Sequence, residues 1–328
     1  MNPLVSICVP VYNSGQYIEK CARSLFCQTY ENIQYIFVDD CSKDDSVQKL
    51  TSIVESLDEP RRKMVHIERH HHNRGVAASR KTSLSLVEGE FILWVDSDDY
   101  IDSNYVYKLI DVQRHTDADI VSCSFVFHSS EGDKILTVKD ITDPKEMVKQ
   151  MLSYRIPVSL WSRLYRSSLF SRDICFEEGR DNGEDYRIVP ILVFLSKKIA
   201  IQPDTMYHYV QHEFSMTHTY DKKISDDVWL AYNYLVDYFS KTDFSLVKYV
   251  NVGYVRVLMK DLIKCCRFKD KDAYYVTRHR IQLMPIKSFM FISIPNFPFL
   301  LIRNYSLSKM LVYIGDRIKS ISCRCLHN

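Results

Sequence analysis

Three carboxylates stand within four residues of one another, directly after a short apolar run. The run covers residues 91–95, and Asp96, Ser97, Asp98 and Asp99 follow it. Like charges at this spacing repel, and a hard cation such as Mg²⁺ or Mn²⁺ offsets the repulsion, because it prefers oxygen ligands and leaves room for substrate phosphates. A polar turn explains the same residues, since Asp and Ser also favour turns and helix caps. The spacing alone indicates a metal site and a turn with equal weight.

A second acidic pair, Asp39 and Asp40, follows the strand-like residues 33–38. Its oxygens are suited to accept hydrogen bonds from a base N–H or a ribose hydroxyl. Helix capping is the more common use of such residues. Ser42 and Asp45, which are spaced like a capping box, predict that a helix begins just after them. The acidic pair by itself is weak support for a ligand.

Two arginines and two further carboxylates lie at predicted helix starts. Arg74 and Arg80 belong to the segment 73–80, where they either meet a diphosphate or face solvent. Glu184 and Asp185 begin a later helical pattern. Acidic residues favour helix N-termini in any case, so a role as general base requires that this pair face the other carboxylates.

The elements that must position these groups alternate between strands and helices over the first hundred residues. Apolar, β-branched runs predict strands, and apolar stripes at helical spacing predict helices. The strands are expected at residues 4–9, 33–38, 64–67 and 91–95, and the helices around residues 18–26, 47–57 and 76–87. This order is typical of an α/β fold with a mainly parallel sheet flanked by helices, whose ligands bind beyond the carboxyl ends of the strands. Both acidic groups are therefore expected at one edge of the sheet.

The remaining chain changes character along its length. Strands are predicted at residues 120–127 and 134–138, helices near 145–152 and 186–195, and a mostly helical pattern beyond residue 224.

Composition excludes several classes of protein. Hydrophobic residues form 46% and charged residues 26% of the 328 residues, as in a soluble globular protein, and the net charge of +2 argues against a general nucleic-acid binder. Eight scattered glycines form neither a dinucleotide fingerprint nor a P-loop. The histidines at 70–72 lack a second ligand group at helical spacing and are expected to be exposed. Ten cysteines in a chain that opens without an apolar signal region indicate reduced thiols and a cytoplasmic protein.

The ordered motifs resemble those of glycosyltransferase family 2, whose members have the GT-A fold. The resemblance rests on residues 10–13 (PVYN), 38–44 (VDDCSKD), 73–80 (NRGVAASR) and 96–99 (DSDD). Residues 161–165, 183–185 and 207–218 are similar to the later motifs of the family. The resemblance implies a GT-A domain over residues 1–220, with a nucleotide-binding half over about 1–100 and an acceptor half over about 100–220. A mostly helical C-terminal region over residues 221–328 would follow.

The resemblance also implies a reaction: inverting, metal-dependent transfer of a hexosyl or N-acetylhexosaminyl group from a nucleotide-diphosphate sugar, with a UDP-sugar as the expected donor. The acceptor would be a hydroxyl of a saccharide or lipid-linked saccharide, in the synthesis of a surface polysaccharide. Donor contacts are implied for Pro10, Tyr12, Asp39, Asp40, Arg80, Asp96 and Ser97. Asp98 with Asp96 would hold Mg²⁺ or Mn²⁺, and Asp185 would be the base, with Glu184 second. Contacts with the acceptor or the phosphates are implied for Trp161, Arg163, His212 and His218.

Several residues depart from the pattern of the family. Cys41 replaces the usual Gly, Arg163 the usual Lys, and His212 and Phe214 the usual Arg and Gly. An Arg grips a diphosphate bidentately, whereas the charge of a His depends on pH. The phosphate contacts of this last loop are therefore expected to differ from those of the family.

Two other classes of function stay open from the sequence. A nucleotidyltransferase that activates sugars also uses sheet-end carboxylates and a divalent metal, although its Gly-rich N-terminal loop is missing here. A non-catalytic, membrane-associated scaffold of the same fold is the other class.

The tail, residues 286–328, combines a helical apolar stripe with six Lys or Arg residues against one Asp. It suits peripheral contact with the anionic inner face of a membrane, and packing against the catalytic domain explains it equally well. Its aromatic run is too short and broken to span a bilayer.

Overall fold

The computed structural model describes residues 2–170, 174, 176–212, 222–291, 305, 306 and 308. The chain divides into two compact units. The first, called the sheet unit, comprises Met1–Met151 and Ile156–Met216, and the second, called the helical unit, comprises Leu152–Arg155 and Thr217–Asn328. The predicted boundary at residue 220 lies outside the described residues.

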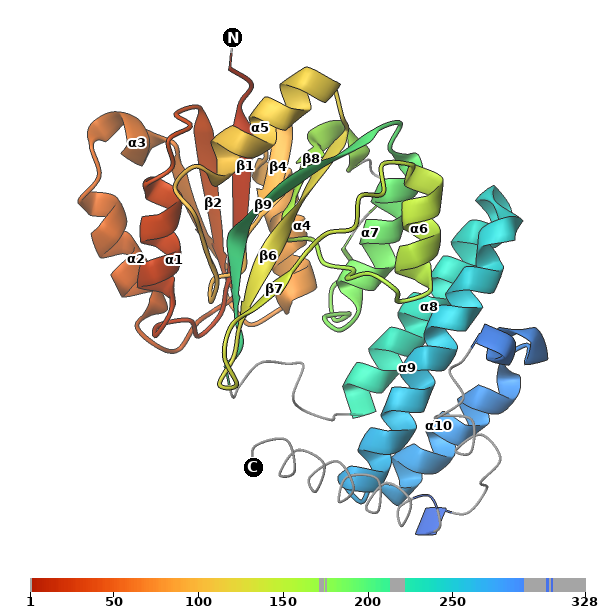
Figure 1. The fold of residues 1–328 in the computed structure, drawn as a ribbon. Helices are drawn as coiled ribbons and strands as arrows, with labels where there is room; N and C mark the ends of the chain where they lie inside the picture. Colours follow the sequence, from red (N-terminus) through yellow and green to blue (C-terminus); the bar gives the residue numbers. More distant parts are fainter. Residues whose placement is uncertain are drawn as a thin grey trace, which may run out of the picture. The chain divides into compact units, whose positions relative to one another are not determined.

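The sheet unit is built on one mixed β-sheet (Figure 1). Its described strands are β1 Val5–Val11, β2 Ile33–Asp39, β3 Val65–Arg69, β4 Phe91–Trp94, β5 Tyr100–Ile101, β6 Ile120–His128, β7 Lys134–Leu136, β8 Arg163–Arg166 and β9 Ile199–Val210. Their order is β3–β2–β1–β4–β8–β6–β9–β5, and β7 pairs with β6. The predicted α/β class is confirmed.

The first hundred residues form the parallel part of this sheet. β3, β2, β1 and β4 run parallel to one another, whereas β8 is antiparallel to both β4 and β6. β9 runs parallel to β6 and antiparallel to β5. Because β1, β2 and β4 are parallel neighbours, their carboxyl ends meet at one edge, as the sequence predicts.

Helices cover both faces of the parallel strands. Successive side chains of a strand point to opposite faces. Val5 and Ile7 of β1 belong to one buried core with Ile18 and Leu25 of helix α1, while the intervening Cys8 is also fully buried and α4 packs against β1 and β2. The helices of this part of the chain are α1 Ile18–Phe26, α2 Ser46–Glu55, α3 Glu59–Lys63, α4 Val76–Leu86, α5 Tyr105–Thr116, α6 Pro144–Leu152 and α7 Glu184–Leu195, with the short 3-10 helix η1 Ser167–Leu169.

The start of α2 differs from the predicted capping box. The helix begins at Ser46, and its N-cap Asp45 makes no side-chain capping hydrogen bond. Asp44 accepts a hydrogen bond from the Ser46 N–H at 3.1 Å, while the Ser42 hydroxyl accepts from the Asn13 N–H at 3.0 Å. The capping-box prediction is therefore wrong, because Ser42 holds the loop after β1 instead of the helix start.

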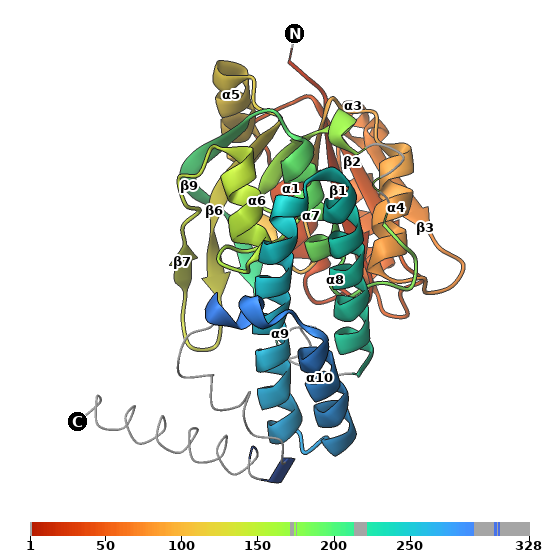
Figure 2. The same cartoon turned by 90° about the vertical axis from the view of Figure 1, so that its right-hand side faces the viewer.

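Long helices dominate the described part of the helical unit (Figure 2). They are α8 Lys222–Thr242, α9 Val247–Arg267 and α10 Lys271–Leu283, with the 3-10 helices η3 Phe244–Leu246 and η4 Ile286–Phe291. Leu235 of α8 and Leu258 and Leu262 of α9 are buried in its interior. A Cβ at Gly253 would collide with the backbone of Leu152, so only glycine permits this close approach. The expected helical C-terminal region is confirmed.

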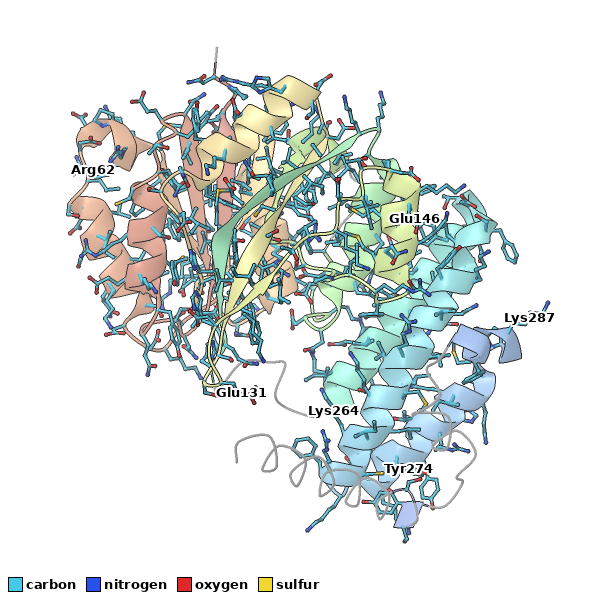
Figure 3. All side chains as sticks on the ribbon, in the orientation of Figure 1. Arg62, Glu131, Glu146, Lys264, Tyr274 and Lys287 are labelled. Carbon is cyan, nitrogen blue, oxygen red and sulfur yellow. The ribbon has the colours of Figure 1, made fainter. Side chains whose placement is uncertain are left out.

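None of the helices within these described ranges has the length and apolar character needed to cross a membrane. Most of the tail predicted at residues 286–328 lies outside the described residues. Lys287 falls within them, and its side chain is exposed (Figure 3). Membrane contact by the tail stays a prediction.

Candidate active site

Asp39, at the end of β2, is enclosed by the protein. The residue is 1% exposed. Its carboxylate accepts a hydrogen bond from the Ser42 N–H at 3.1 Å and pairs with the guanidinium of Arg69, with 3.0 Å between Nε and Oδ2. The charge is thus balanced by the protein itself.

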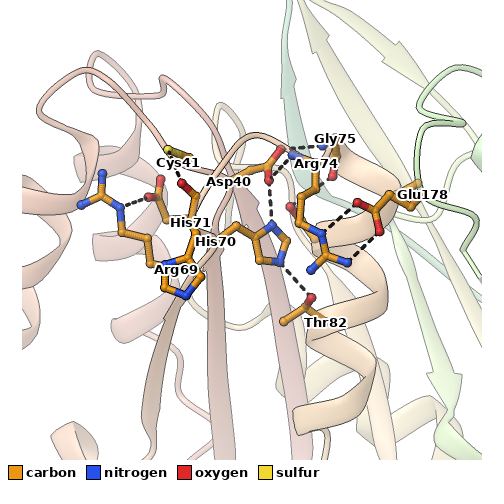
Figure 4. Close-up of polar contacts among 12 residues, drawn as sticks. Asp40, Cys41, Arg69, His70, His71, Arg74, Gly75, Thr82 and Glu178 are labelled. Atoms are coloured by element: carbon orange, nitrogen blue, oxygen red, sulfur yellow. Dashed lines mark hydrogen bonds and ion pairs between the residues drawn. The ribbon is translucent and has the colours of Figure 1, made fainter.

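Asp40 is enclosed in the same way (Figure 4). It is 2% exposed, and it accepts hydrogen bonds from the N–H groups of Arg74 at 2.9 Å and Gly75 at 2.7 Å. Its Oδ1 also lies 2.7 Å from Nδ1 of His70, whose Nε2 lies 2.9 Å from the Thr82 hydroxyl. His70 is buried, so the expectation that it is exposed is wrong: it is drawn in by Asp40. The two histidines that follow it are exposed, as expected.

The other residues predicted beside the nucleotide base frame this strand end. Pro10 lies within β1, opposite Val38 of β2, and is buried. Tyr12, just beyond β1, is 46% exposed. Cys41 has a φ of 62°, a left-handed conformation that favours glycine, which explains why the family's usual Gly suits this position.

Asp98 is the most open carboxylate of the acid turn, residues 96–99. It exposes 34% of its side chain, against 27% for Asp96. Its Oδ2 lies 2.8 Å from Nε2 of His212, and the His212 ring stacks on Tyr17 at 4.9 Å between centroids. In the part of the chain that is described, no group of three or more His, Cys, Asp or Glu side chains is arranged to hold a metal ion. An open carboxylate beside an imidazole nevertheless fits a divalent cation whose other ligands are substrate phosphates and water.

Asp99 and Ser97 face the protein instead. Asp99 is 1% exposed and accepts hydrogen bonds from the Tyr207 hydroxyl at 2.6 Å and the Val210 N–H at 2.8 Å. The Ser97 hydroxyl lies 2.6 Å from the Ser14 hydroxyl. Burial, and then the nearby charges of the acid turn, raise the pKa of Asp99 well above its usual value. These two residues therefore fix the turn in place.

Arg80 of α4 joins the acid turn to the start of α7. Its side chain is 4% exposed, and its guanidinium contacts Glu184 at 2.5 Å, Asp185 at 3.0 Å and Asp96 at 3.3 Å. Asp185 also accepts a hydrogen bond from the Leu160 N–H at 3.2 Å. The structure thus brings together three groups that the sequence predicted separately, and the pair at the start of α7 does face the acid turn.

Charge is concentrated at this centre. Although burial alone would lower it, the pKa of Arg80 is raised above its usual value by Asp185, Glu184 and Asp96. Burial raises the pKa of Glu184 to about 8, against the pull of Arg80. Burial likewise raises the pKa of Asp96 to about 6, with Asp98 and Asp185 adding to the rise against Arg80. The single positive charge of Arg80 therefore faces three carboxylates and cannot neutralise all of them.

An aromatic cluster adjoins the acid turn. Trp161, which is half-buried, stacks on Tyr207 at 4.8 Å and on Tyr209 at 5.3 Å between ring centroids. Arg163 is buried, and its guanidinium donates to the backbone oxygens of Pro157 and Ser159. Trp161 is thus partly open near the site, whereas Arg163 holds the loop before it. His218, the last predicted residue, lies outside the described residues.

Sequence reasoning missed the acidic loop that covers the start of α4. Glu178 accepts two hydrogen bonds from Arg74, at 2.9 and 2.7 Å (Figure 4), and Asp181 accepts from the Ala77 N–H at 3.2 Å. A Cβ at Gly75, whose φ is 90°, would collide with the Asp181 carboxylate. These partners lie 104 residues apart in the chain, so no local pattern could have revealed them. Tyr207 was also missed, although it lies within a motif that the resemblance singled out.

Comparison with known proteins now identifies the class. Residues 6–176 match Glycosyl transferase family 2, and the chain belongs to this family. It is 30% identical to glycosyltransferase GlyA of Streptococcus pneumoniae over 67% of this chain and 32% of GlyA, and 28% identical to GlyG of the same organism over 70% of this chain and 82% of GlyG.

A solved structure supports the same class at the level of the fold. TarS of Staphylococcus aureus, a poly(ribitol-phosphate) beta-N-acetylglucosaminyltransferase, is 27% identical over 62% of this chain and 35% of TarS. The crystal structure of its residues 1–349 with UDP-GlcNAc superposes with a TM-score of 0.60 at 19% identity, covering 85% of this chain and 92% of that one. The GT-A-type fold expected from the sequence is confirmed. The aligned region spans only about a third of GlyA and of TarS.

Proposed function

We propose that this chain is an inverting, metal-dependent glycosyltransferase. It would move a hexosyl or N-acetylhexosaminyl group from a UDP-sugar to a hydroxyl of a saccharide or lipid-linked saccharide, in polysaccharide synthesis. The observation that carries the proposal is the Arg80 centre, which unites Asp96 of the acid turn with Glu184 and Asp185. Sugar transfer needs stabilisation of the leaving group and a proton acceptor at one place, and these two groups of carboxylates supply both.

The donor would lie along the carboxyl ends of β1, β2 and β4. Pro10, Tyr12, Asp39 and Asp40 are the proposed surroundings of the base, and Arg80, Asp96 and Ser97 those of the remaining nucleotide sugar. Because Asp40 is enclosed, its contribution is to hold the N–H groups of Arg74 and Gly75 in place. The relation to TarS, which was crystallised with UDP-GlcNAc, supports a UDP-sugar as donor.

Asp98, with Asp96, is the proposed holder of Mg²⁺ or Mn²⁺. Such an ion, when bound, supplies Lewis-acid stabilisation of the departing nucleoside diphosphate. The contact between Arg80 and Asp96 fixes one side of this ligand pair. His212, beside Asp98, offers a nitrogen where the family has an arginine.

Asp185 is the proposed general base, with Glu184 second. The Asp185 side chain is 21% exposed, against 10% for Glu184, so it is the more accessible to an acceptor hydroxyl. Glu184 is also the carboxylate held closest to the Arg80 guanidinium, and burial raises its pKa, so it is the less suited of the two to act as the proton acceptor. Asp185 would take the acceptor proton as the acceptor oxygen attacks the sugar from the face opposite the nucleotide, which inverts the anomeric centre.

The acceptor side is proposed to include Trp161, His212 and His218, with Arg163 supporting the loop that carries Trp161. Residues 1–100 and 100–220 would be the nucleotide-binding and acceptor halves of one domain. We further propose a cytoplasmic location with peripheral membrane contact through residues 286–328. Salt-dependent sedimentation of the full chain with anionic liposomes measures that contact, because screening weakens it.

A panel of nucleotide sugars tests the proposed function directly. With Mn²⁺ present, we expect release of a nucleoside diphosphate from one or a few donors, and a faster release when a saccharide acceptor is added. Release of pyrophosphate from a nucleoside triphosphate and a sugar phosphate would indicate a nucleotidyltransferase. Binding without any turnover would indicate the non-catalytic scaffold.

A further inference from the structure

We propose that Tyr207 is a positioning residue, which acts through Asp99 to hold Asp96 and Asp98 in the geometry that the transfer requires. The inference rests on the proposed function and adds to it a fully buried residue that is not among the proposed donor contacts. It starts from the partners of the Tyr207 hydroxyl.

That hydroxyl touches both ends of the acid turn. It donates to Oδ2 of Asp99 at 2.6 Å and accepts from the Asp96 N–H at 3.3 Å. The turn itself is closed by a hydrogen bond from the Asp99 N–H to the Asp96 carbonyl at 3.1 Å. One side-chain oxygen therefore bridges the first and last residues of the segment that carries Asp98.

The ring that presents this hydroxyl has little freedom. Tyr207 is fully buried, stacks on Trp161 with 14° between the ring planes, and meets Tyr105 edge to face at 6.3 Å. Its backbone lies between two strands, in register with Ile101 of β5 and Phe125 of β6. The position of the hydroxyl is thus set by the sheet.

The end of β9 reinforces the same contact. The Val210 N–H donates to the other oxygen of Asp99 at 2.8 Å, and His212, two residues later, lies against Asp98. Asp99 is 1% exposed, so its oxygens are satisfied by the protein and are not available to a ligand. Asp99 therefore anchors the acid turn to β9 through these two hydrogen bonds.

These hydrogen bonds matter because the negative charges of the acid turn repel one another. Asp96 and Asp98 repel each other, and of these two carboxylates only Asp96 forms an ion pair with Arg80. A displacement of about 1 Å at a reacting centre can cost about 10²-fold in rate. A turn that is free to relax would move Asp98 away from the leaving group without unfolding the protein.

The test compares Tyr207→Phe with the matched variant Tyr105→Phe. Both keep a buried ring and remove a hydroxyl, but the Tyr105 hydroxyl makes no hydrogen bond to the acid turn. We expect kcat to fall by about 30-fold or more in Tyr207→Phe, and Mn²⁺ binding in the presence of UDP, followed by the EPR signal of free Mn²⁺, to weaken about tenfold. Tyr105→Phe should change neither quantity by more than about threefold.

A double-mutant cycle with Asp99→Asn separates positioning from general damage. If Tyr207 acts through Asp99, each single variant loses kcat to a similar degree and the double variant is no worse than either. Wild-type kcat in Tyr207→Phe, or losses that multiply in the double variant, would overturn the proposal. If Tyr207→Phe does not fold, Asp99→Asn decides alone, because wild-type kcat and Mn²⁺ binding in that variant contradict the inference. Absence of transfer by the wild-type chain would instead defeat the proposed function, while Mn²⁺ binding still reports on Tyr207.

Discussion

Two strand ends in the sheet unit carry the same kind of residue and use it differently. At the end of β2, Asp39 and Asp40 are almost fully enclosed and accept hydrogen bonds from backbone N–H groups. Asp39 also forms an ion pair with Arg69, and Asp40 contacts His70. At the end of β4, Asp98 is one-third exposed, and Asp96 shares Arg80 with the carboxylates of α7. Carboxylates surrounded by donors become part of the framework, whereas the more open carboxylates near Arg80 are those proposed to hold a cation and to accept a proton.

The largest effect is expected from removal of Arg80. Arg80→Ala leaves buried negative charge without its partner, which costs about 3–5 kcal/mol of unfolding free energy, measured by urea denaturation. Arg74→Ala is the matched control at the β2 end, because its ion pair with Glu178 is open to solvent on both sides and its loss should cost much less stability. Equal stability losses in the two variants would contradict the contrast between the strand ends.

Asp98→Asn should affect chemistry without affecting the fold. The change removes one anionic metal ligand, so transfer at saturating Mn²⁺ should fall by about 10²-fold or more while the melting temperature stays within about 2 °C. Asp40→Asn is the counterpart at the β2 end. The two backbone N–H groups contact different oxygens of Asp40, and the amide nitrogen of Asn cannot accept a hydrogen bond, so this variant should lose about 1–3 kcal/mol of stability. Unchanged turnover in Asp98→Asn would contradict the proposal that Asp98 binds the metal ion.

The raised pKa of Glu184 predicts a pH effect on stability. Between its usual value of 4.5 and about 8, the folded chain holds a proton that the unfolded chain releases, so stability falls as pH rises through this window. Glu184→Gln removes this pH-dependent contribution. The melting temperature of the variant should therefore rise relative to that of the wild type as pH increases. The comparison with Glu184→Gln separates Glu184 from Asp96 and Asp99, whose pKa values burial also raises, because both of those groups are present in the two proteins. A difference in melting temperature between the two proteins that stays constant from about pH 6 to pH 8 would contradict this origin of the pH dependence.

The smallest effect concerns Cys41, where the chain departs from its family. Its φ of 62° costs a residue with a Cβ about 1 kcal/mol, which glycine avoids. Cys41→Gly should thus stabilise the protein by up to about 1 kcal/mol, while Cys41→Ala, which keeps the Cβ, should not. A stability gain in both variants would point to the thiol rather than to the backbone.

The positions of the strand ends could be predicted from the sequence, but the contacts that their carboxylates make could not. Residues 33–38 and 91–95 are strand-like, mainly apolar runs followed at once by Asp, so the edge of the sheet could be predicted from local pattern. The fates of Asp40 and Asp96 depend on His70 and Arg80, whose contacts form only when distant segments pack. His70 was expected to be exposed for the same reason: nothing local marks it as the partner of Asp40.

Interactions at long sequence separation also explain why the site was predicted as separate pieces. Arg80 and Glu184 are 104 residues apart, and Tyr207 and Asp99 are 108 apart. Each residue taken alone has a plain local explanation, as a helix start or a strand residue. The capping box failed in the same way, because Ser42 bonds to Asn13, 29 residues earlier, and not to the helix beside it.

Asp185, held on Arg80 beside the acid turn, is proposed to accept the proton of the acceptor hydroxyl. The most direct test measures donor binding by calorimetry and transfer by nucleoside diphosphate release in Asp185→Asn, with Glu184→Gln as its control. We predict that Asp185→Asn binds the donor within about threefold of the wild type and loses about 10² to 10⁴-fold in transfer, while Glu184→Gln keeps most of its activity. Full transfer by Asp185→Asn together with an inactive Glu184→Gln would contradict the assignment.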